Sequence, residues 1–250
     1  MRLPHSSVLG IVQIANFCVQ VITMIFIHLG THKTGTTSIQ RCLADNCQLL
    51  RGRGYDVYHG VHLHGANHVE MHLSCLRPER DSFIKLRNPQ ADYGEGFRAA
   101  IIQRVRGFLA SSPQPHQIFS NEGMSWLRFP DEMERLRDLL QADHRAICFI
   151  LYLRERKSFA ASYRRQIYKV PGRTASKDPE SVCYIEDDSW LLDYNALLST
   201  YRSAFPDAMF KVIDYDAELA ARGSVLPSFF AAIDTEPPAD AHEYFLNKTG

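Results

Sequence analysis

A short apolar segment, the glycine-bracketed loop after it and the amphipathic stretch beyond constrain this chain more than any other feature. Residues 22–28 are largely apolar, and Gly30 and Gly35 enclose the loop that follows. Apolar side chains then recur at helical spacing, at Ile39, Cys42, Leu43 and Leu50. An apolar run that ends at glycine is typical of a buried parallel strand, and a Thr or Ser at 36–38 can cap the helix. The segment predicts a strand, a loop and a helix in that order.

Strands and helices are predicted to alternate along the rest of the chain as well. Strands are expected at residues 117–120, 146–153 and 210–213, and helices at 66–76, 93–109, 131–140, 190–205 and 225–233. A further helix follows the strand at 146–153, with Phe159, Tyr163 and Ile167 on its inward face. Residues 171–189 hold Pro, Gly, Ser and acids and are expected to form a mobile loop. The alternation predicts an α/β fold, a parallel sheet with helices on both faces.

The size and charge of the chain limit the choice of partners. With 250 residues, 45% hydrophobic and 22% charged, it can bury one sizeable core, so residues 24–250 are expected to form a single domain. Lys and Arg together number 28, as do Asp and Glu. No overall field then attracts nucleic acid or an anionic membrane, and an anion site must come from local clustering. The six cysteines lack CxxC pairing, which favours a reducing compartment and a cytoplasmic location.

The first 23 residues are expected to be an N-terminal extension outside this domain. The stretch 8–29 is largely apolar, and its length is close to the roughly 20 residues that span a bilayer. Three Asn or Gln side chains interrupt it, and signal-peptide cleavage at its end would remove the strand at 22–28. We therefore expect Met24 to be the working start and no membrane partner, unless residues 8–29 are a real anchor. An extra packed element is the third alternative.

The loop between the first predicted strand and helix can hold an anion. Free backbone N–H groups and the positive end of the helix dipole face such a loop, and its glycines let the backbone turn tightly and approach a ligand. Lys33 adds a positive charge, and hydroxyl groups add donors. The residues expected to surround the anion are Thr31, His32, Lys33, Thr34, Gly35, Thr36, Thr37 and Ser38. A turn that merely joins a strand to a helix is the plain alternative.

The order of lysine and glycine separates this loop from the ATP-binding loop of the P-loop NTPases. That motif is G-x-x-x-x-G-K-[ST], with lysine after the second glycine, whereas Lys33 precedes Gly35 and Thr36 follows it. The strand at 146–153 ends in Arg154, where an aspartate would be needed to hold Mg²⁺. We expect a P-loop-NTPase-like sheet that binds a different anion without a metal. A P-loop nucleotide kinase remains an alternative.

A second anion site is expected where basic side chains cluster after the strand at 146–153. From Leu151 to Arg173, seven residues are Lys or Arg and one, Glu155, is acidic. The basic residues are Arg154, Arg156, Lys157, Arg164, Arg165, Lys169 and Arg173. Arg154 stands at the carboxyl end of the strand, and Ser162 lies about two helical turns further on. Both can reach one phosphate at the carboxyl edge of the sheet, where open α/β sheets bind their ligands.

The segments IHLGTHKTGTTSIQ and LYLRERKSFAASYRRQI resemble the two phosphate-binding motifs of the sulfotransferases that use 3'-phosphoadenosine-5'-phosphosulfate (PAPS), in particular their bacterial carbohydrate-type branch. FSNEGMSWL at 119–127 and FKVIDYD at 210–216 resemble that family more loosely, so the resemblance covers most of 24–235. Members usually begin just before the first strand, which supports Met24 as the start. They usually continue past the NKTG that ends this chain, which is therefore expected to be short at its C-terminus.

The resemblance implies a reaction and a co-substrate. PAPS is expected to give a sulfuryl group to an acceptor hydroxyl, most simply that of a carbohydrate or another small molecule, with no metal and no nucleic acid involved. In the family, the first motif holds the 5'-phosphosulfate, and the matching residues here run from Lys33 to Ser38. The residues that match those holding the 3'-phosphate are Arg154 and Ser162. A catalytically inactive protein that keeps the nucleotide site is the alternative from a different class.

Catalysis of sulfuryl transfer needs a stabilised leaving oxygen and a base for the acceptor. Lys33 is expected to stabilise the leaving oxygen, because positioning and electrostatics carry most of such a transfer. Glu122, after a predicted strand end, is the first candidate for the base, since the resemblance places an acid near the acceptor in several members. A surface acid that caps the next helix is the alternative. Residues 51–90 and 171–189 are expected to line the acceptor side.

His68 is the second candidate for the base. It is the middle of three histidines at the helical spacing i, i+4, i+8, namely His64, His68 and His72. Two histidines four residues apart can bind zinc, but no HExxH pattern accompanies them. An ordinary polar helix face is the plain alternative, and no metal site is expected.

Overall fold

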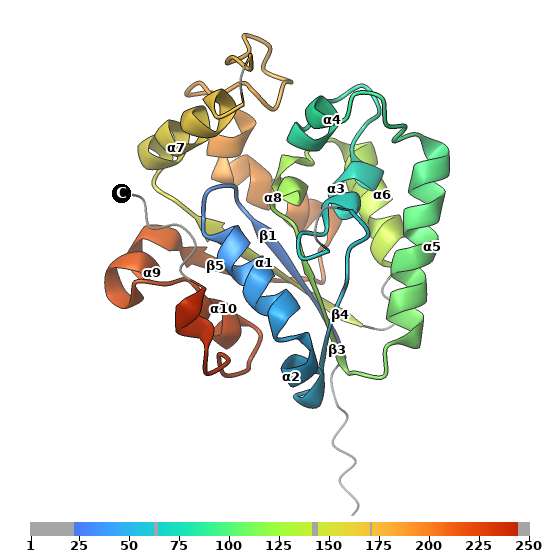
Figure 1. The fold of residues 1–250 in the computed structure, drawn as a ribbon. Helices are drawn as coiled ribbons and strands as arrows, with labels where there is room; N and C mark the ends of the chain where they lie inside the picture. Colours follow the sequence, from blue (N-terminus) through green and yellow to red (C-terminus); the bar gives the residue numbers. More distant parts are fainter. Residues whose placement is uncertain (1–22, 63–64, 142–144, 171, 245–250) are drawn as a thin grey trace, which may run out of the picture.

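Five parallel strands form the centre of the computed structural model, which describes residues 23–62, 65–141, 145–170 and 172–244 (Figure 1). The strands, in the order β2–β3–β1–β4–β5, are β2 (Tyr55–Val57), β3 (His116–Ser120), β1 (Met24–Gly30), β4 (Ala146–Leu153) and β5 (Met209–Asp214). Each neighbouring pair is parallel. Parallel strands need crossover connections, and helices supply them here. The prediction of a single α/β domain with a P-loop-NTPase-like sheet is confirmed.

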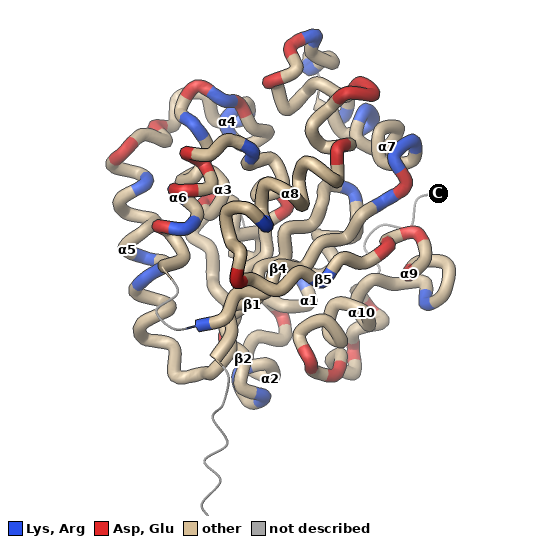
Figure 2. Tube along the Cα trace, turned by 180° about the vertical axis from the view of Figure 1, so that it is seen from behind, with Lys and Arg blue, Asp and Glu red and all other residues tan. Residues whose placement is uncertain are grey.

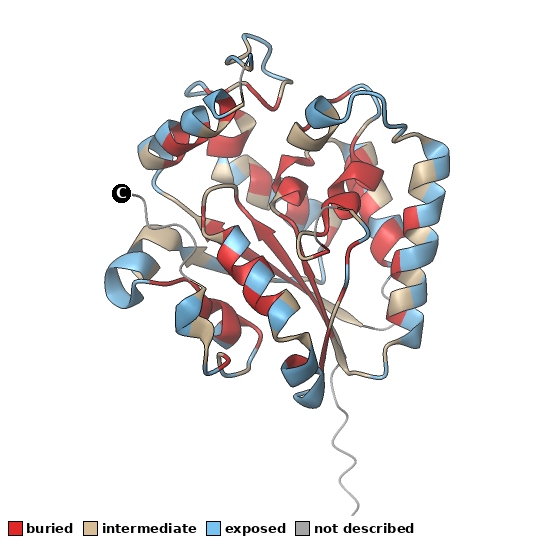
Figure 3. Ribbon diagram, in the orientation of Figure 1, coloured by how far each residue is buried: buried red, intermediate tan, exposed pale blue. Residues whose placement is uncertain are grey.

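Helices cover both faces of the sheet because β1 is apolar on both sides. Ile25, Ile27 and Leu29 belong to one buried cluster and Phe26 to another, as expected for a strand whose side chains alternate in direction. The first cluster includes residues of α3 (Val69–Cys75), α5 (Glu95–Ser111), α6 (Pro130–Leu140), α7 (Arg156–Tyr168) and α8 (Tyr194–Ala204). The second includes residues of α1 (Thr36–Asp45), α2 (Cys47–Gly52) and α10 (Leu226–Ala232). Figure 3 shows the buried strands between these two layers.

Most predicted elements are present within two residues of their expected bounds, but the helices expected at 66–76 and 190–205 begin later than predicted, at Val69 and Tyr194. A short 3₁₀ turn occupies Trp190–Leu192, and α8 begins only at Tyr194. Asp193 separates them because its Oδ1 accepts the amide of Ala196 at 3.0 Å, the usual bond of an N-cap side chain. Residues 172–189 contain no helix or strand, as expected for a loop.

Three short elements lie where the sequence pattern predicts no helix or strand. They are β2, α4 (Phe83–Arg87) and α9 (Tyr215–Arg222). β2 has three residues and α4 five, so neither is long enough to display a period. α9 follows β5 directly, starting from the N-cap Asp214, whose Oδ1 accepts the amide of Ala217 at 2.9 Å. Its exposed surface explains the weak apolar signal, since none of its residues is buried.

The predicted N-terminal extension lies almost entirely outside the described residues, which begin at position 23. The described part of the apolar stretch 8–29 includes Met24–Leu29, which lies in the central strand β1, paired with β3 on one side and β4 on the other. Within the described residues, no helix is both long enough and apolar enough to cross a membrane.

Candidate functional site

The loop after β1 turns in the left-handed region at three positions. Gly30 has φ 80°, Lys33 φ 64° and Gly35 φ 77°. The amide and the hydroxyl of Thr31 both donate to the carbonyl of Tyr152 on β4, each at 3.1 Å. The hydroxyl of Thr34 donates to the carbonyl of Thr31 at 2.6 Å. Thr31 and Thr34 are fully buried, so these two hydroxyls hold the loop in shape and are not free to donate to a ligand.

Gly30 is needed where the loop touches the segment after β3. A Cβ at this position would lie 2.8 Å from the Cβ of Glu122 and 3.2 Å from the Cγ2 of Thr36. The strand register explains the approach, because His28 lies opposite Ser120 and both strands end at the same edge of the sheet. The sequence therefore needs glycine here for two reasons, its positive φ and the absence of a side chain.

Replacement of Gly30 by alanine is expected to lower the free energy of unfolding by about 2–4 kcal/mol, because it adds left-handed strain to a clash with Glu122. Denaturation in urea measures the change. Gly107→Ala is the matched control, since Gly107 is exposed within α5 and a Cβ there meets no atom within 4 Å. It should stabilise the protein by up to about 1 kcal/mol. Equal stability of Gly30→Ala and wild type would contradict the close approach.

Helix α1 opens directly onto this loop. Its N-cap is Gly35, with no side-chain hydrogen bond at the cap, so the expectation that a hydroxyl at 36–38 caps the helix is wrong. The amides of Thr36 and Thr37 occupy the first turn, where a helix offers them no acceptor. Thr37 is exposed, whereas Thr36 and Ser38 are mostly buried. Unpaired amides and the helix dipole leave this end of α1 suited to an anion.

Basic side chains gather on the other side of the loop. Arg154 at the end of β4 donates from Nη1 to the carbonyl of Lys33 at 3.2 Å. The pKa of the Lys33 ammonium is lowered first by burial and then by the positive charges of Lys169, Arg154 and Arg165. Figure 2 shows the Lys and Arg positions along α7 that follow Arg154. The two sequence motifs therefore meet, and the cations they bring together repel one another unless an anion lies between them.

Arg154 is also in contact with the segment that begins α9. Its guanidinium carbon lies 5.2 Å from the centre of the Tyr215 ring, and its Nε lies 3.8 Å from Oδ1 of Asp216. Ser162, its predicted partner for the 3'-phosphate, is buried on α7 at 6% exposure. Tyr215 and Asp216 are therefore neighbours of the second predicted anion site. The two phosphate-binding motifs do not include these residues.

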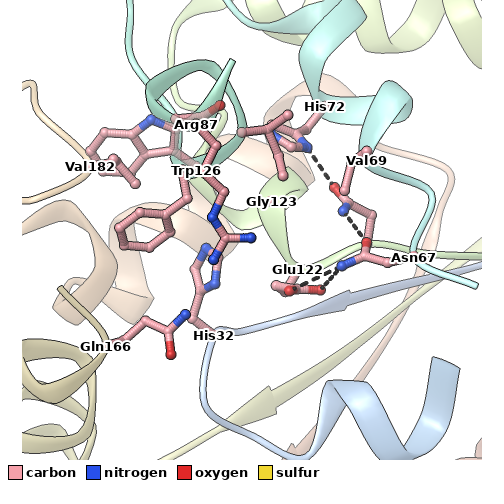
Figure 4. Close-up of a pocket in the computed structure, with 14 residues that line it drawn as sticks. His32, Asn67, Val69, His72, Arg87, Glu122, Gly123, Trp126, Gln166 and Val182 are labelled. Atoms are coloured by element: carbon pink, nitrogen blue, oxygen red, sulfur yellow. Dashed lines mark hydrogen bonds between the residues drawn. The ribbon is translucent and has the colours of Figure 1, made fainter. Parts of the chain in front are cut away.

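A cavity of about 120 Å³ lies beside the loop, with Glu122 on its wall (Figure 4). His32, the residue before Lys33, also lines it. The ring of His32 packs edge-on against Tyr163, with ring centres 5.5 Å apart, and burial lowers its pKa, with Glu122 raising it and Lys33 lowering it further. The remaining wall combines Trp126, Phe83 and Val182 with Asn67, His72, Ser82, Arg87, Asn121 and Gln166. The cavity thus borders the loop at His32, the residue next to Lys33 in the sequence.

Glu122 is held in place by amide side chains. Its Oε2 accepts from Nε2 of Gln40 at 2.8 Å, and Nδ2 of Asn67 lies 3.3 Å from both of its oxygens. The Nδ2 of Asn121 donates to Oδ1 of Asn67 at 2.6 Å, and Oδ1 of Asn121 contacts Nδ1 of His72 at 2.9 Å. Figure 4 shows this chain of contacts running from Glu122 to His72. Sequence reasoning missed Asn67, Asn121 and the position of His72.

His68 is not brought together with Lys33 and Glu122. Helix α3 begins only at Val69, and both the amide and Nδ1 of His68 bond to the backbone of Ser120, at 3.1 and 2.9 Å. Burial lowers the pKa of His68 to about 3. The residue lines a different cavity, next to Asp56 and Tyr58. The expected helical face of three histidines is therefore wrong, and His64 lies outside the described residues.

Comparison with solved structures identifies a protein that shares this fold. No family model matches this chain, and no curated protein matches it either. Among solved structures, a sulfotransferase from Alicyclobacillus acidocaldarius aligns with a TM-score of 0.53 and 18% identity, covering 87% of each chain. A sulfotransferase domain from the curacin biosynthetic pathway aligns with a TM-score of 0.48 and 16% identity, covering 91% of this chain and 79% of that one. The chain shares its fold with the first of these sulfotransferases.

Proposed function

We propose that this chain is a sulfotransferase that moves a sulfuryl group from PAPS to an acceptor hydroxyl, that of a carbohydrate. The observation that carries the proposal is the electrostatic setting of Lys33. Its ammonium is repelled by Lys169, Arg154 and Arg165 and attracted by Glu122, which lines a cavity that could receive an acceptor. An anionic group in transfer would meet the lysine on one side and the acceptor on the other. The shared fold and the two sequence motifs support the same reaction.

Each end of the donor has residues that fit it. The first-turn amides of α1 and the charge of Lys33 fit a 5'-phosphosulfate. Arg154 and Ser162 fit a 3'-phosphate, and Arg154 contacts the Lys33 carbonyl, so the two sites adjoin. The lowered pKa of Lys33 supports a polyanionic ligand, because its neighbours are cations whose repulsion an anion would relieve. In this proposal Lys33 stabilises the charge that develops on the leaving oxygen.

The cavity beside the loop fits a carbohydrate acceptor. Phe83 offers aromatic surface for the C–H face of a sugar ring, and Gln166 and Arg87 offer polar groups for its hydroxyls. Of the two bases expected from the sequence, Glu122 lines this cavity and His68 does not. Of these two, only Glu122 therefore lies where the acceptor would bind.

A P-loop nucleotide kinase is the competing enzyme, since the fold is P-loop-like. That reaction needs a carboxylate near the end of the strand beside the loop to hold Mg²⁺, and β4 ends next to Arg154 instead. A binding protein without activity is the second competitor. It would keep the nucleotide site but transfer no sulfuryl group.

Binding of 3',5'-adenosine bisphosphate (PAP), the product nucleotide, is the direct test. At about 100 times its Kd, PAP should raise the Tm by about 5–10 °C in the presence of EDTA, because selective binding to the folded state adds about 2.7 kcal/mol. Differential scanning fluorimetry measures the shift, with 5'-AMP as the ligand that lacks the 3'-phosphate. If Mg·ATP raises the Tm and PAP does not, the kinase is the better assignment. Transfer of radiolabelled sulfate to a panel of glycan and lipid acceptors separates an enzyme from an inactive binder.

A further inference from the structure

The hydrogen-bond chain that starts at Glu122 fixes which nitrogen of His72 carries the proton. A carboxylate only accepts hydrogen bonds, so the amide of Asn67 must turn its NH₂ group toward Glu122 and its oxygen toward Asn121. Asn121 must then turn its own NH₂ toward Asn67, which leaves its oxygen facing His72 at 2.9 Å. An oxygen acceptor requires a donor, so Nδ1 of His72 holds the proton and Nε2 holds the lone pair.

The surroundings of His72 keep the ring neutral and in place. Burial lowers its pKa to about 4, with the contact to Asn121 and the charge of Glu122 raising it and the charges of His32 and Lys85 lowering it. The ring therefore carries no charge at neutral pH. Gly123 leaves room for it, since a Cβ on that residue would overlap the ring. The only hydrogen bond of the ring to another described residue is the one to Asn121, so Nε2 has no partner of its own.

His72 also lines the cavity that we assign to the acceptor. His68 and His28, by contrast, lie elsewhere: His68 lines another cavity, and His28 packs under Phe229 on the opposite face of the sheet. His32 shares the cavity, but its ring is packed edge-on between Phe83 and Tyr163. Among these histidines, His72 alone combines a place on the cavity wall with a hydrogen bond that sets its tautomer.

We propose that His72 is the general base of the reaction and that Glu122 is a positioning residue acting through Asn67 and Asn121. This inference rests on the proposed function. The acceptor oxygen forms a bond to sulfur while the bond from sulfur to the bridging phosphate oxygen breaks, and that electron pair stays with the released PAP. The acceptor proton moves to Nε2 of His72. The imidazolium then holds a proton on each nitrogen, with the charge of Glu122 at the far end of the chain, and returns one proton to water.

Two substitutions at position 72 test whether His72 acts as the base. In His72→Asn the side-chain amide can replace Nδ1–H as the donor to Asn121 but offers no Nε2, so kcat should fall about 100-fold, while the rise in Tm with PAP stays as in wild type. His242→Asn is the matched control, because His242 is exposed on η3 (Ala241–Glu243), outside the cavity. It should transfer at the wild-type rate. His72→Gln, which places an amide near Nε2, provides a second inactive variant if the first does not fold.

The tautomer gives a readout that does not depend on activity. Long-range ¹H–¹⁵N spectra of protein labelled with ¹⁵N-histidine should show His72 protonated at Nδ1. In Glu122→Gln the new amide can donate or accept, so the chain is no longer fixed, and the Nε2-protonated form of His72 should become populated as transfer falls. A merely structural role for Glu122 would not move this equilibrium.

The outcomes separate this inference from the proposed function. If wild type transfers sulfate and PAP raises its Tm, but His72→Asn keeps the wild-type rate, His72 is not the base and the function stands. Protonation at Nε2 in wild type would likewise overturn the assignment. If PAP leaves the Tm unchanged and no acceptor is labelled, the proposed function fails and the base falls with it.

Discussion

Replacement of Lys33 by alanine should reduce sulfuryl transfer by about 10³-fold without unfolding the protein. The loss follows from removing a full charge at the leaving oxygen, where a single donor contributes a factor of about 10² to 10³. Stability should be preserved, because alanine has the same Cβ as lysine and meets the same constraint at φ 64°. Since Lys169, Arg154 and Arg165 repel the ammonium, the ligand-free variant should be at least as stable as wild type. Initial rates with radiolabelled PAPS and thermal unfolding measure the two effects.

The control for Lys33→Ala is Lys157→Ala, which removes a lysine charge from the surface of α7. Lys157 is exposed on α7, and it is not among the charges that shift the pKa of Lys33. Lys157→Ala should therefore transfer at close to the wild-type rate. Equal losses in the two variants would mean that the overall basic field matters and the position of Lys33 does not. Full transfer by Lys33→Ala would reject its role even if PAP still binds.

The strand, loop and helix at residues 24–45 could be predicted from the sequence because their determinants are local. An apolar run, two glycines with four residues between them and the lysine in that gap all lie within residues 24–36. Its meeting with Arg154 could also be anticipated, since parallel strands end at one edge of the sheet. The structure has β1 and β4 adjacent, with Arg154 bonded to the Lys33 carbonyl. Short-range pattern and sheet topology were enough to predict that these two segments meet.

The acceptor side could not be predicted in the same way. Whether His68 or His72 faces the cavity depends on where α3 begins, and contacts with β3 set that start. The helix begins after His68 because Ser120 on β3 takes both the amide and Nδ1 of that residue, contacts between segments 52 positions apart. The orientation of His72 depends on Asn67 and Asn121, which are 54 residues apart. Such contacts are set by tertiary packing and leave no periodic signal in the chain.

A buried ion pair that sequence reasoning also missed supports the wall of the cavity that we assign to the acceptor. The side chains of Arg80 and Glu132 are 1% and 0% exposed, and Nη1 of Arg80 lies 2.7 Å from Oε2 of Glu132. Arg80 also donates to the carbonyl of Trp126, which lines the cavity. Glu132 accepts the amides of Arg77 and Arg128 as well. One carboxylate thus joins α6 to the segments before α4 and after the 3₁₀ turn η1 (Glu122–Trp126).

Replacement of Glu132 by alanine should lower the free energy of unfolding by about 3–5 kcal/mol, since it leaves the Arg80 guanidinium buried without a counter-charge. Urea denaturation at neutral pH measures the loss. Glu134→Ala on the exposed side of the same helix should change stability by no more than about 0.5 kcal/mol.

Neither Arg80 nor Glu132 can be removed alone without leaving its partner buried and unpaired. The double variant Arg80→Met with Glu132→Met should therefore be more stable than Glu132→Ala alone, because apolar side chains of similar length remove both buried charges together. It should still lose part of the stability, since the amides of Arg77 and Arg128 then lack their acceptor. If Glu132→Ala costs less than about 1 kcal/mol, or if the double variant is no better than the single one, the guanidinium reaches water in the variant and the buried pair does not hold the cavity wall.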